Sequence, residues 1–496
     1  MKQFFKSGFL LSLLLLFSCV TQDDVFIEDT VEPDPNAGVQ VQNFMWKAMN
    51  FWYFWQSEVA NLADDRFANT QEGSDAYTDF LLSEDDPGAF FDNKLLFNED
   101  RFSFYNDDYV ELTQSLSGIS KSNGMEFGLV RIPDSNEIVG YVRYIIPNSD
   151  AASKDIERGE YFIGVDGVTL TDSNFGSLLF GSNDTYTLNM SSPVNGVMQL
   201  NGKDVTLTKQ ENLQENPIHI DEILEINGST IGYLMYNGFT NEFDEQLNDV
   251  FGRFKSGGVT DLVLDLRYNP GGSVNTARLL SSMIYGTDTD KVFLKARYNE
   301  KYQKILEDNG TDLQDYFADK TGEGTSLNSL ELNKVYIITT QGSASASELV
   351  INGLTPYMEV VQIGDVTRGK NEFSVTMVDD RENNYLYDPT RVDKIPSDNQ
   401  WAIQPLLGRN ENADGFSDYT DGLVPDIQES ENLSDLGILG DPNENLLAIA
   451  IEEITGVTNT AKKAPSSSIP MEVITSSKLE TLMGDRMYVT DVPIVE

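Results

Sequence analysis

Residues 259–272 read VTDLVLDLRYNPGG. The part that ends at Leu266 is rich in leucine and β-branched residues, a composition typical of a strand buried on both faces of a sheet. Residues 241–255 precede it with apolar side chains on one helical face, and Gly257-Gly258 ends that helix. A buried strand that follows an amphipathic helix indicates a core of alternating strands and helices.

The same alternation continues on both sides of this stretch, from about residue 209 to residue 455. Strands are expected at 231–236, 334–340 and 359–364, and helices at 273–285 and 346–354. The pattern predicts an α/β domain over 209–455. With 496 residues, the chain is long enough for about three folded units.

Two further units precede the α/β domain. Residues 41–103 begin with a dense aromatic stripe at helical spacing, which favours an N-terminal helical domain whose aromatic side chains pack in a core. Residues 104–208 carry short alternating runs broken by Gly, Asn and Asp, and they predict a β-rich module. Residues 456–496 are weakly patterned, so the structure of this C-terminal tail stays open.

The N-terminal residues indicate export and anchoring. A lysine-bearing start precedes an apolar run at 9–17, which is too short to span a bilayer and suits a signal peptide over residues 1–18. The run leads into LFSC, which resembles the lipobox of bacterial lipoproteins and implies lipidation of Cys19. Residues 19–40 are rich in Asp, Glu, Pro and Gly and predict a flexible tether. We therefore expect a protein held in the bacterial cell envelope, at the outer membrane, by its lipid alone.

The composition excludes several classes of function. A formal net charge of −46 argues against nucleic acid as a partner, because phosphate binding needs clustered Lys and Arg. The sequence has one histidine, His219, and one cysteine, so it contains no zinc motif. A partial EF-hand spacing, N-x-N-x-D-G at 410–415, is better explained as a turn cluster. We predict neither a metal nor a cofactor.

The candidate nucleophile lies in QGSASASE, residues 341–348, between an expected strand and an expected helix. Its small residues let a substrate and the backbone approach closely. A serine in the first turn of a helix lies at the positive end of the helix dipole, beside N–H groups that have no partner within the helix. Such a position can stabilise an oxyanion, although a helix N-cap is the commoner role of a Ser/Ala cluster.

Three blocks together resemble the C-terminal processing (tail-specific) peptidases, a family of serine peptidases with a Ser–Lys dyad. They are SASASE at 343–348, a Gly-Lys pair whose lysine follows Ser345 by 25 residues, and LDLRYNPGG at 264–272. The resemblance implies a ClpP/crotonase-like fold for the α/β core and a peptidase activity. The site roles that it implies are Ser345 as the nucleophile, Lys370 as its base, and Ala346 with Gly271 or Gly272 as oxyanion donors.

Lys370 acts as a base only if it loses its charge. A lysine ordinarily titrates near ~10.4 and is protonated at neutral pH, so burial has to lower its pKa. Two residues near Lys370 depart from the family pattern. The orienting Gln or Glu that is common four residues after the lysine is Ser374 here, with Glu372 and Thr367 as competing candidates. The usual Phe two residues before the lysine is Arg368.

The β-rich module resembles a PDZ domain through the order of three segments. They are MEFGL at 125–129, residues 141–146, and GEYFIGVDG at 159–167. PDZ domains add an extended peptide to a sheet edge and hold its terminal carboxylate on backbone N–H groups. By this resemblance, Phe127, Gly128 and Leu129 would bind the carboxylate of a protein tail.

These features predict a serine endopeptidase that captures the C-terminal tails of envelope or extracellular proteins and cleaves them through an acyl-enzyme. An alternative is a catalytically weak or inactive, lipid-anchored peptide-binding protein on the same scaffold, suggested by Ser374 and Arg368. A surface protein of a nutrient-uptake system is a third candidate, which rests on the acidic lipoprotein start alone.

Overall fold

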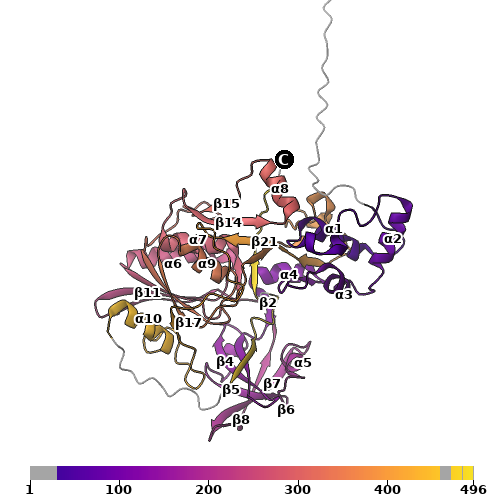
Figure 1. Cartoon of the computed structure of the whole chain (residues 1–496). Coiled ribbons are helices and arrows are strands. Elements are labelled where there is room, and N and C mark those ends of the chain that lie inside the picture. Colours follow the sequence, from indigo (N-terminus) through magenta and orange to yellow (C-terminus); the bar gives the residue numbers. More distant parts are fainter. Residues whose placement is uncertain (1–30, 458–470, 483, 495–496) are drawn as a thin grey trace, which may run out of the picture.

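The computed structural model describes residues 31–457, 471–482 and 484–494. A helical N-terminal unit and a β-rich module each contact a larger α/β core (Figure 1). The predicted signal peptide and Cys19 lie outside the described residues. Among the helices of the described ranges, none combines the length and the apolar character needed to cross a bilayer.

The N-terminal unit is helical, as expected. Its helices are α1 (Gln40–Trp52), α2 (Gln71–Leu81) and α3 (Pro87–Phe90). The aromatic side chains of α1 are core residues, and the indole of Trp52 donates a hydrogen bond to the carbonyl oxygen of Asn384 in the α/β core. The prediction of a flexible tether is wrong for residues 31–39. Val31 is only 4% exposed, so burial of apolar surface holds this stretch on the helical unit.

The β-rich module is built on one antiparallel sheet of seven strands. Across the sheet these are β23 (Glu472–Ser476), β3 (Met125–Arg131), β4 (Ile138–Ile145), β5 (Tyr161–Val165), β7 (Thr185–Val194) and β8 (Val197–Thr208), with β6 (Val168–Thr169) paired to β5. Helix α5 (Phe175–Leu179) packs on the core of this sheet. The edge strand β23 comes from the C-terminal residues, far from the rest of the module in sequence.

The module begins later than residue 104. Strand β1 (Phe104–Asn106) pairs with β20 (Ala402–Gln404), and α4 (Tyr109–Leu116) packs against the α/β core through Leu112. Residues 104–116 therefore belong with the core, where their apolar side chains find partners. A two-stranded ribbon of β2 (Ile119–Ser122) and β9 (Gln210–Gln214) leads into and out of the module.

The α/β core has a six-stranded sheet that is parallel from its second strand onward. In order the strands are β10 (Ile218–Ile226), β11 (Ser229–Tyr236), β12 (Asp261–Asp265), β16 (Lys334–Thr339), β17 (Glu359–Gly364) and β22 (Ile427–Gln428). Helices α6 (Asp244–Ser256), α7 (Val274–Tyr285) and α9 (Ala346–Leu354) cover one face, and α10 (Asn445–Thr455) covers the other. Leu264 packs with the first group and Val263 with α10, which confirms burial of this strand on both faces.

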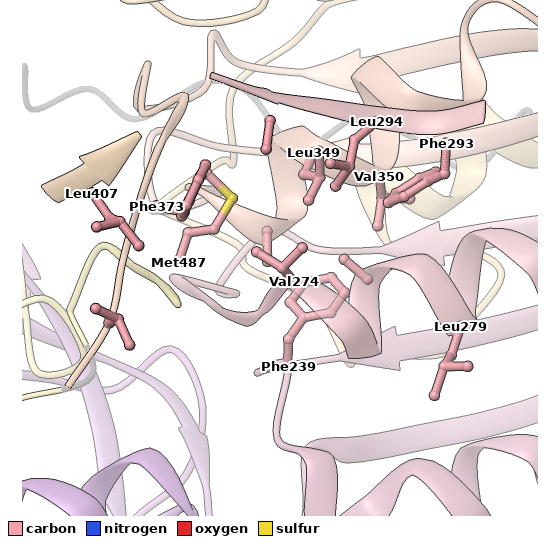
Figure 2. Packing of buried hydrophobic residues seen from close by; sticks show 14 of the residues in the cluster. Phe239, Val274, Leu279, Phe293, Leu294, Leu349, Val350, Phe373, Leu407 and Met487 are labelled. Atoms are coloured by element: carbon pink, nitrogen blue, oxygen red, sulfur yellow. The ribbon is translucent and has the colours of Figure 1, made fainter. Parts of the chain in front are cut away.

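A second six-stranded sheet packs beside the first. Its order is β13 (Gly271–Ser273), β24 (Arg486–Tyr488), β18 (Glu372–Ser374), β21 (Leu406–Glu411), β14 (Val292–Tyr298) and β15 (Gln314–Tyr316). The C-terminal strand β24 therefore lies between β13 and β18, and Figure 2 shows its Met487 beside Phe373 in the core. The predicted combination of an α/β core with an N-terminal helical unit is confirmed.

Candidate active site

Ser345 lies at the turn between β16 and α9. It is fully buried, and its backbone has φ 61° and ψ −113°, a left-handed conformation that is uncommon for residues other than glycine. Its Oγ forms no hydrogen bond to any described residue. Strained backbone of this kind clusters at functional sites, where the surrounding structure holds a side chain in a set position.

Hydrogen bonds hold this turn against the LDLRYNPGG segment. The Ser343 hydroxyl donates to the carbonyl oxygen of Leu266 (2.8 Å), and Ala344 N and the Ser347 hydroxyl both donate to the carbonyl oxygen of Asn269 (3.1 and 2.9 Å). Two of the three blocks noticed in the sequence are therefore in direct contact.

Glu348 joins the third block to this turn. Its Oε2 accepts from the backbone N–H of Ser345 (2.7 Å) and from that of Lys370 (2.9 Å). Its Oε1 accepts from Gly369 N (2.7 Å) and from the Thr367 hydroxyl (2.6 Å). One fully buried carboxylate thus holds the backbones of the candidate nucleophile and the candidate base together.

Sequence reasoning missed Glu348 as a functional residue. The signal was present, because Ser345 and Glu348 have the S-x-x-E spacing of a capping box, in which the glutamate binds the N-cap backbone N–H. Burial raises the pKa of Glu348 to about 7, although its hydrogen bonds act in the opposite direction.

Lys370 is 1% exposed, and burial lowers the pKa of its amine to about 7. The nearby charge of Arg486 lowers it further, while carboxylates at Asp485 and Glu372 oppose the shift. Its Nζ donates to the carbonyl oxygen of Asp485 at 2.5 Å and not to Ser345. The expected burial is therefore present, and the amine is engaged by a residue of the C-terminal segment.

The residues considered for orienting Lys370 have other partners. The Ser374 hydroxyl donates to the carbonyl oxygen of Met487 (3.2 Å), and Glu372 forms an ion pair with Arg409 (3.0 Å). The Thr367 hydroxyl donates a hydrogen bond to Glu348 instead. In the described structure, none of the three hydrogen-bonds the amine of Lys370.

Gly271 and Gly272, the candidate oxyanion residues, have φ values of 110° and 137° that favour glycine. A Cβ at Gly271 would lie 2.6 Å from Cβ of Ser345 and 2.2 Å from the carbonyl oxygen of Arg486. The N–H of Gly271 already donates to Oδ1 of Asn269 (3.0 Å), and Gly272 pairs with Met487 of β24. Ala346 follows Ser345 as the first residue of α9.

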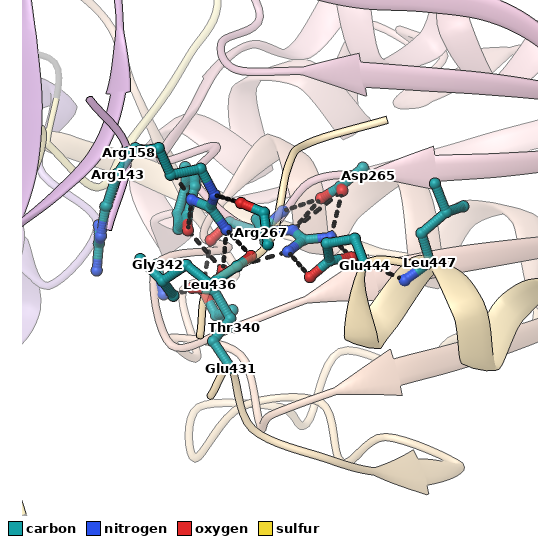
Figure 3. Close-up of polar contacts among 12 residues, drawn as sticks. Arg143, Arg158, Asp265, Arg267, Thr340, Gly342, Glu431, Leu436, Glu444 and Leu447 are labelled. Carbon is teal, nitrogen blue, oxygen red and sulfur yellow. Dashed lines mark hydrogen bonds and ion pairs between the residues drawn. The ribbon is translucent and has the colours of Figure 1, made fainter. Parts of the chain in front are cut away.

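A buried charge network lies next to the loop that carries Ser345 (Figure 3). The guanidinium of Arg267 is fully buried and contacts carboxylates of Asp265, Glu444 and Glu431 at 2.7 to 3.2 Å. The carbonyl oxygen of Arg267 accepts from the Thr340 hydroxyl at the start of the Ser345 turn. Arg267 therefore links the end of β12 to the loops that carry the candidate nucleophile.

The residues predicted to bind a carboxylate lie on β3, next to the edge strand of the β-rich module. Phe127 N donates to Oγ of Ser477 (2.9 Å), and Ser477 N donates to the carbonyl oxygen of Phe127 (2.9 Å). Gly128 and Leu129 pair with residues of β23. A cavity of about 410 Å³ opens beside Phe127. Its apolar lining includes Met125, Leu179 and Phe180.

No described group of three or more His, Cys, Asp or Glu side chains is arranged to hold a metal ion. The groups present at the site are a buried serine, a buried lysine of lowered pKa, and helix and glycine N–H groups.

Comparison with known proteins agrees with this arrangement. The Peptidase family S41 profile matches residues 230–400, and the Peptidase S41 N-terminal domain profile matches residues 40–104. A crystal structure assigned to the S41 proteases, from Bacteroides fragilis, superposes with a TM-score of 0.62 at 26% identity, and the match covers 87% of this chain and 100% of that one.

Two curated proteins are similar over shorter stretches. A CtpA-like serine protease of Staphylococcus aureus is 26% identical over 190 residues, which are 36% of this chain and 35% of the relative. A carboxyl-terminal-processing protease of a Picosynechococcus species is 22% identical over 275 residues, 53% of this chain and 58% of the relative. The chain thus spans between about a third and three fifths of the curated relatives it matches. Together with the fold, these similarities relate residues 40–104 and 230–400 of the chain to peptidase family S41.

Proposed function

We propose that this protein is a serine endopeptidase in which Ser345 is the nucleophile and Lys370 its general base. The observation that carries the proposal is the shared carboxylate of Glu348, which fixes the backbones of both residues in one buried pocket. A pKa of about 7 leaves a substantial fraction of the Lys370 amine neutral at physiological pH, as a base requires.

In the proposed reaction, Oγ of Ser345 attacks the carbonyl carbon of a peptide bond while Nζ of Lys370 takes the hydroxyl proton. The N–H groups of Ala346 and Gly272 support the negative charge that develops on the carbonyl oxygen, helped by the dipole of α9. Lys370 returns the proton to the leaving amine, and water then hydrolyses the acyl-enzyme. Nζ has to exchange its contact with Asp485 for one with Ser345 before the first step.

The β-rich module is proposed to act as a PDZ-like binder of C-terminal tails. Support comes from the position of β3, which without β23 is one of the two edge strands of the module's sheet. The cavity beside Phe127 also suits an apolar terminal side chain. The proposed substrates are unfolded or extended tails of envelope and extracellular proteins. Lipidation at Cys19 would hold the enzyme at the outer membrane near them.

A second candidate is a peptide-binding protein without turnover on the same scaffold. It is favoured by the lack of a hydrogen bond between Ser345 and Lys370, and by Ser374, which contacts the C-terminal strand instead of the lysine. A fluorophosphonate reagent separates the two functions, because it labels only an activated serine. Labelling at Ser345 favours the peptidase.

Replacement of the nucleophile tests the peptidase directly. Ser345→Ala is expected to abolish cleavage of an unfolded polypeptide with an apolar C-terminus, while the circular dichroism spectrum stays unchanged. Ser347→Ala is the matched control, since it removes a hydroxyl from the same turn and loses only one hydrogen bond, to the carbonyl oxygen of Asn269. Gel-based assays of both variants decide the matter. Full cleavage by Ser345→Ala would remove the assignment.

A further inference from the structure

We infer that residues 471–482 and 484–494 of this chain occupy the path that a substrate would take, and that a substrate has to displace them. The inference rests on the proposed function and adds an occupant to that site. Residues 471–482 and 484–494 are together called the C-terminal segment below. The segment occupies two places in turn, the edge of β3 in the β-rich module and the space between the two halves of the candidate active site.

At the first place, the C-terminal segment binds as an added strand. β23 runs antiparallel to β3, with Glu472 opposite Arg131 and Ser476 opposite Gly128, so it proceeds toward Phe127. Ile474 packs on the core that contains α5. These features are those of an extended peptide bound at a sheet edge, where the main chain supplies affinity and alternate side chains supply selectivity.

The groups expected to receive a carboxylate are also taken. The Ser477 hydroxyl accepts from the N–H of Phe127 and donates to the buried carboxylate of Glu126 at 2.5 Å. Next to it, Lys478 forms an ion pair with Glu215 (2.9 Å) and donates to the carbonyl oxygen of Asn237 (2.7 Å). The hydroxyl of an internal residue thus occupies the donor that a terminal carboxylate would use, and the chain continues past it toward the catalytic residues.

At the second place, the segment lies between β13, which begins with Gly271, and β18, which follows Lys370. β24 is parallel to β13, with Arg486 opposite Gly271, and Tyr488 is opposite Ser374 in β18. The carbonyl oxygen of Arg486 and Cβ of Ser345 approach the same face of Gly271. A peptide that presents a carbonyl group to Ser345 needs this same space.

The C-terminal segment also binds the amine of Lys370, the candidate base. Nζ of Lys370 donates to the carbonyl oxygen of Asp485, and the side chain of Asp485 forms an ion pair with Arg368 (3.0 Å). While these contacts last, Oγ of Ser345 has no partner in the described structure. The arrangement is that of a bound competitor, and it accounts for the absence of a hydrogen bond between Ser345 and Lys370.

The first place is the weaker of the two, and we expect displacement to begin there. Val473 is 49% exposed, and the ion pair between Glu472 and Arg131 lies at the surface, where such pairs contribute little. Met487 and Tyr488, by contrast, are buried. A substrate tail that takes the β3 edge would therefore peel off β23 before β24.

A reversible disulfide between β3 and β23, called the lock below, tests the inference. Arg131→Cys with Glu472→Cys, in a chain that also carries Cys19→Ser, places two cysteines at directly opposed positions of β3 and β23, a separation that suits a disulfide. The probe is a fluorescein-labelled unstructured peptide with an apolar C-terminus. Its binding is measured by fluorescence anisotropy in a Ser345→Ala background, and its cleavage in the chain that keeps Ser345.

Oxidation is expected to weaken binding of the probe by at least about tenfold and to stop cleavage, and dithiothreitol is expected to restore both. The matched control is Thr187→Cys with Thr206→Cys, an opposed pair on β7 and β8 of the same module that does not touch the C-terminal segment. Equal binding by the oxidised and reduced lock, or no binding by either, overturns the inference. If the lock blocks binding but the reduced Ser345 chain cleaves nothing, the inference stands and the proposed function fails.

A second pair of variants loosens the segment instead. Ile474→Asp removes an apolar contact with the module core and is expected to raise affinity for the probe by about fivefold, because the competitor is weakened by roughly 1 kcal/mol. Val473→Asp adds the same charge at an exposed neighbour and is expected to leave the affinity nearly unchanged. Equal effects of the two changes would contradict a role for the Ile474 contact.

Discussion

Lys370 is balanced between its charged and neutral forms near neutral pH. Burial lowers the pKa of its amine to about 7, and the positive charge of Arg486 acts in the same direction. Only the neutral amine accepts the hydroxyl proton of Ser345, so the charge state of this one residue is expected to govern turnover.

The pH profile of kcat/KM tests this balance. The value is expected to rise with pH up to an apparent pKa near 7 and to level off above it, because kcat/KM reports ionisations of the free enzyme. Arg486→Gln removes a repulsive charge, so the pKa of Lys370 rises and the midpoint moves to higher pH. Initial rates between about pH 5 and about pH 9 check both shifts. A midpoint near 10.5, the ordinary value for lysine, would contradict the burial argument.

At this scale the sequence predicted the candidate dyad but not the residue that assembles it. Short motifs with fixed spacing carried Ser345 and Lys370. Glu348 was part of the same motif, yet its role depends on the loop at 367–370 folding back to supply three more hydrogen-bond donors. That return is a property of the tertiary structure, which a local pattern does not contain. The orienting role expected of Ser374 stays a prediction, since its hydroxyl donates to the C-terminal segment in this structure.

At the scale of the element, β13 begins with Gly271 because no larger residue fits between Ser345 and β24. A Cβ at Gly271 would meet a backbone oxygen at 2.2 Å, and the φ of 110° is unfavourable for any other residue. The strand therefore allows a main chain, such as that of the C-terminal segment, to lie directly against Ser345.

Gly271→Ala is expected to lower the free energy of unfolding by more than about 2 kcal/mol and to abolish cleavage, because neither Ser345 nor β24 can keep its place. Gly258→Ala is the control. Gly258 also has a positive φ, but an added methyl group there would meet no atom within 4 Å, so the change costs only about 1–2 kcal/mol of backbone strain. Urea unfolding and peptide cleavage of both variants give the comparison. Similar losses in the two would show that backbone conformation, and not contact with β24, explains the glycine.

The elements that the sequence predicted are those whose patterns are local. Helix α9 has the expected bounds of 346–354, and β12 lies inside the expected strand at 259–266. The two C-terminal strands could not be predicted in the same way. β23 pairs with β3 more than 300 positions earlier in the chain, and β24 has only three residues. Short strands of this kind are specified by distant partners and not by their own periodicity.

At the scale of the whole molecule, a buried charge cluster joins the β-rich module to the α/β core. Arg158 from the module and Arg267 from the core both contact the carboxylate of Glu431, at 3.0 and 3.2 Å (Figure 3). Burial alone would raise the pKa of Glu431, but the two guanidinium groups outweigh it and lower the pKa to about 2. This contact joins the module that carries β3 to the core that carries Ser345.

Glu431→Gln should therefore be costly, because it leaves two buried cations short of a counter-charge. We expect a loss of about 3–5 kcal/mol in the free energy of unfolding at neutral pH. Glu411→Gln, which breaks a partly exposed ion pair with Arg297, is the control and is expected to cost at most about 1 kcal/mol.

The sign of the pH dependence follows from the lowered pKa of Glu431. The stability that Glu431 contributes is present above its unfolded pKa of 4.5 and is lost as the pH falls toward about 2. The wild-type chain therefore loses this stability in acid. Glu431→Gln does not, because it has no carboxyl group to titrate at that position. Urea unfolding of the three proteins at neutral and acidic pH measures the difference, and parallel pH profiles for wild type and Glu431→Gln would show that the domains are held together by other contacts.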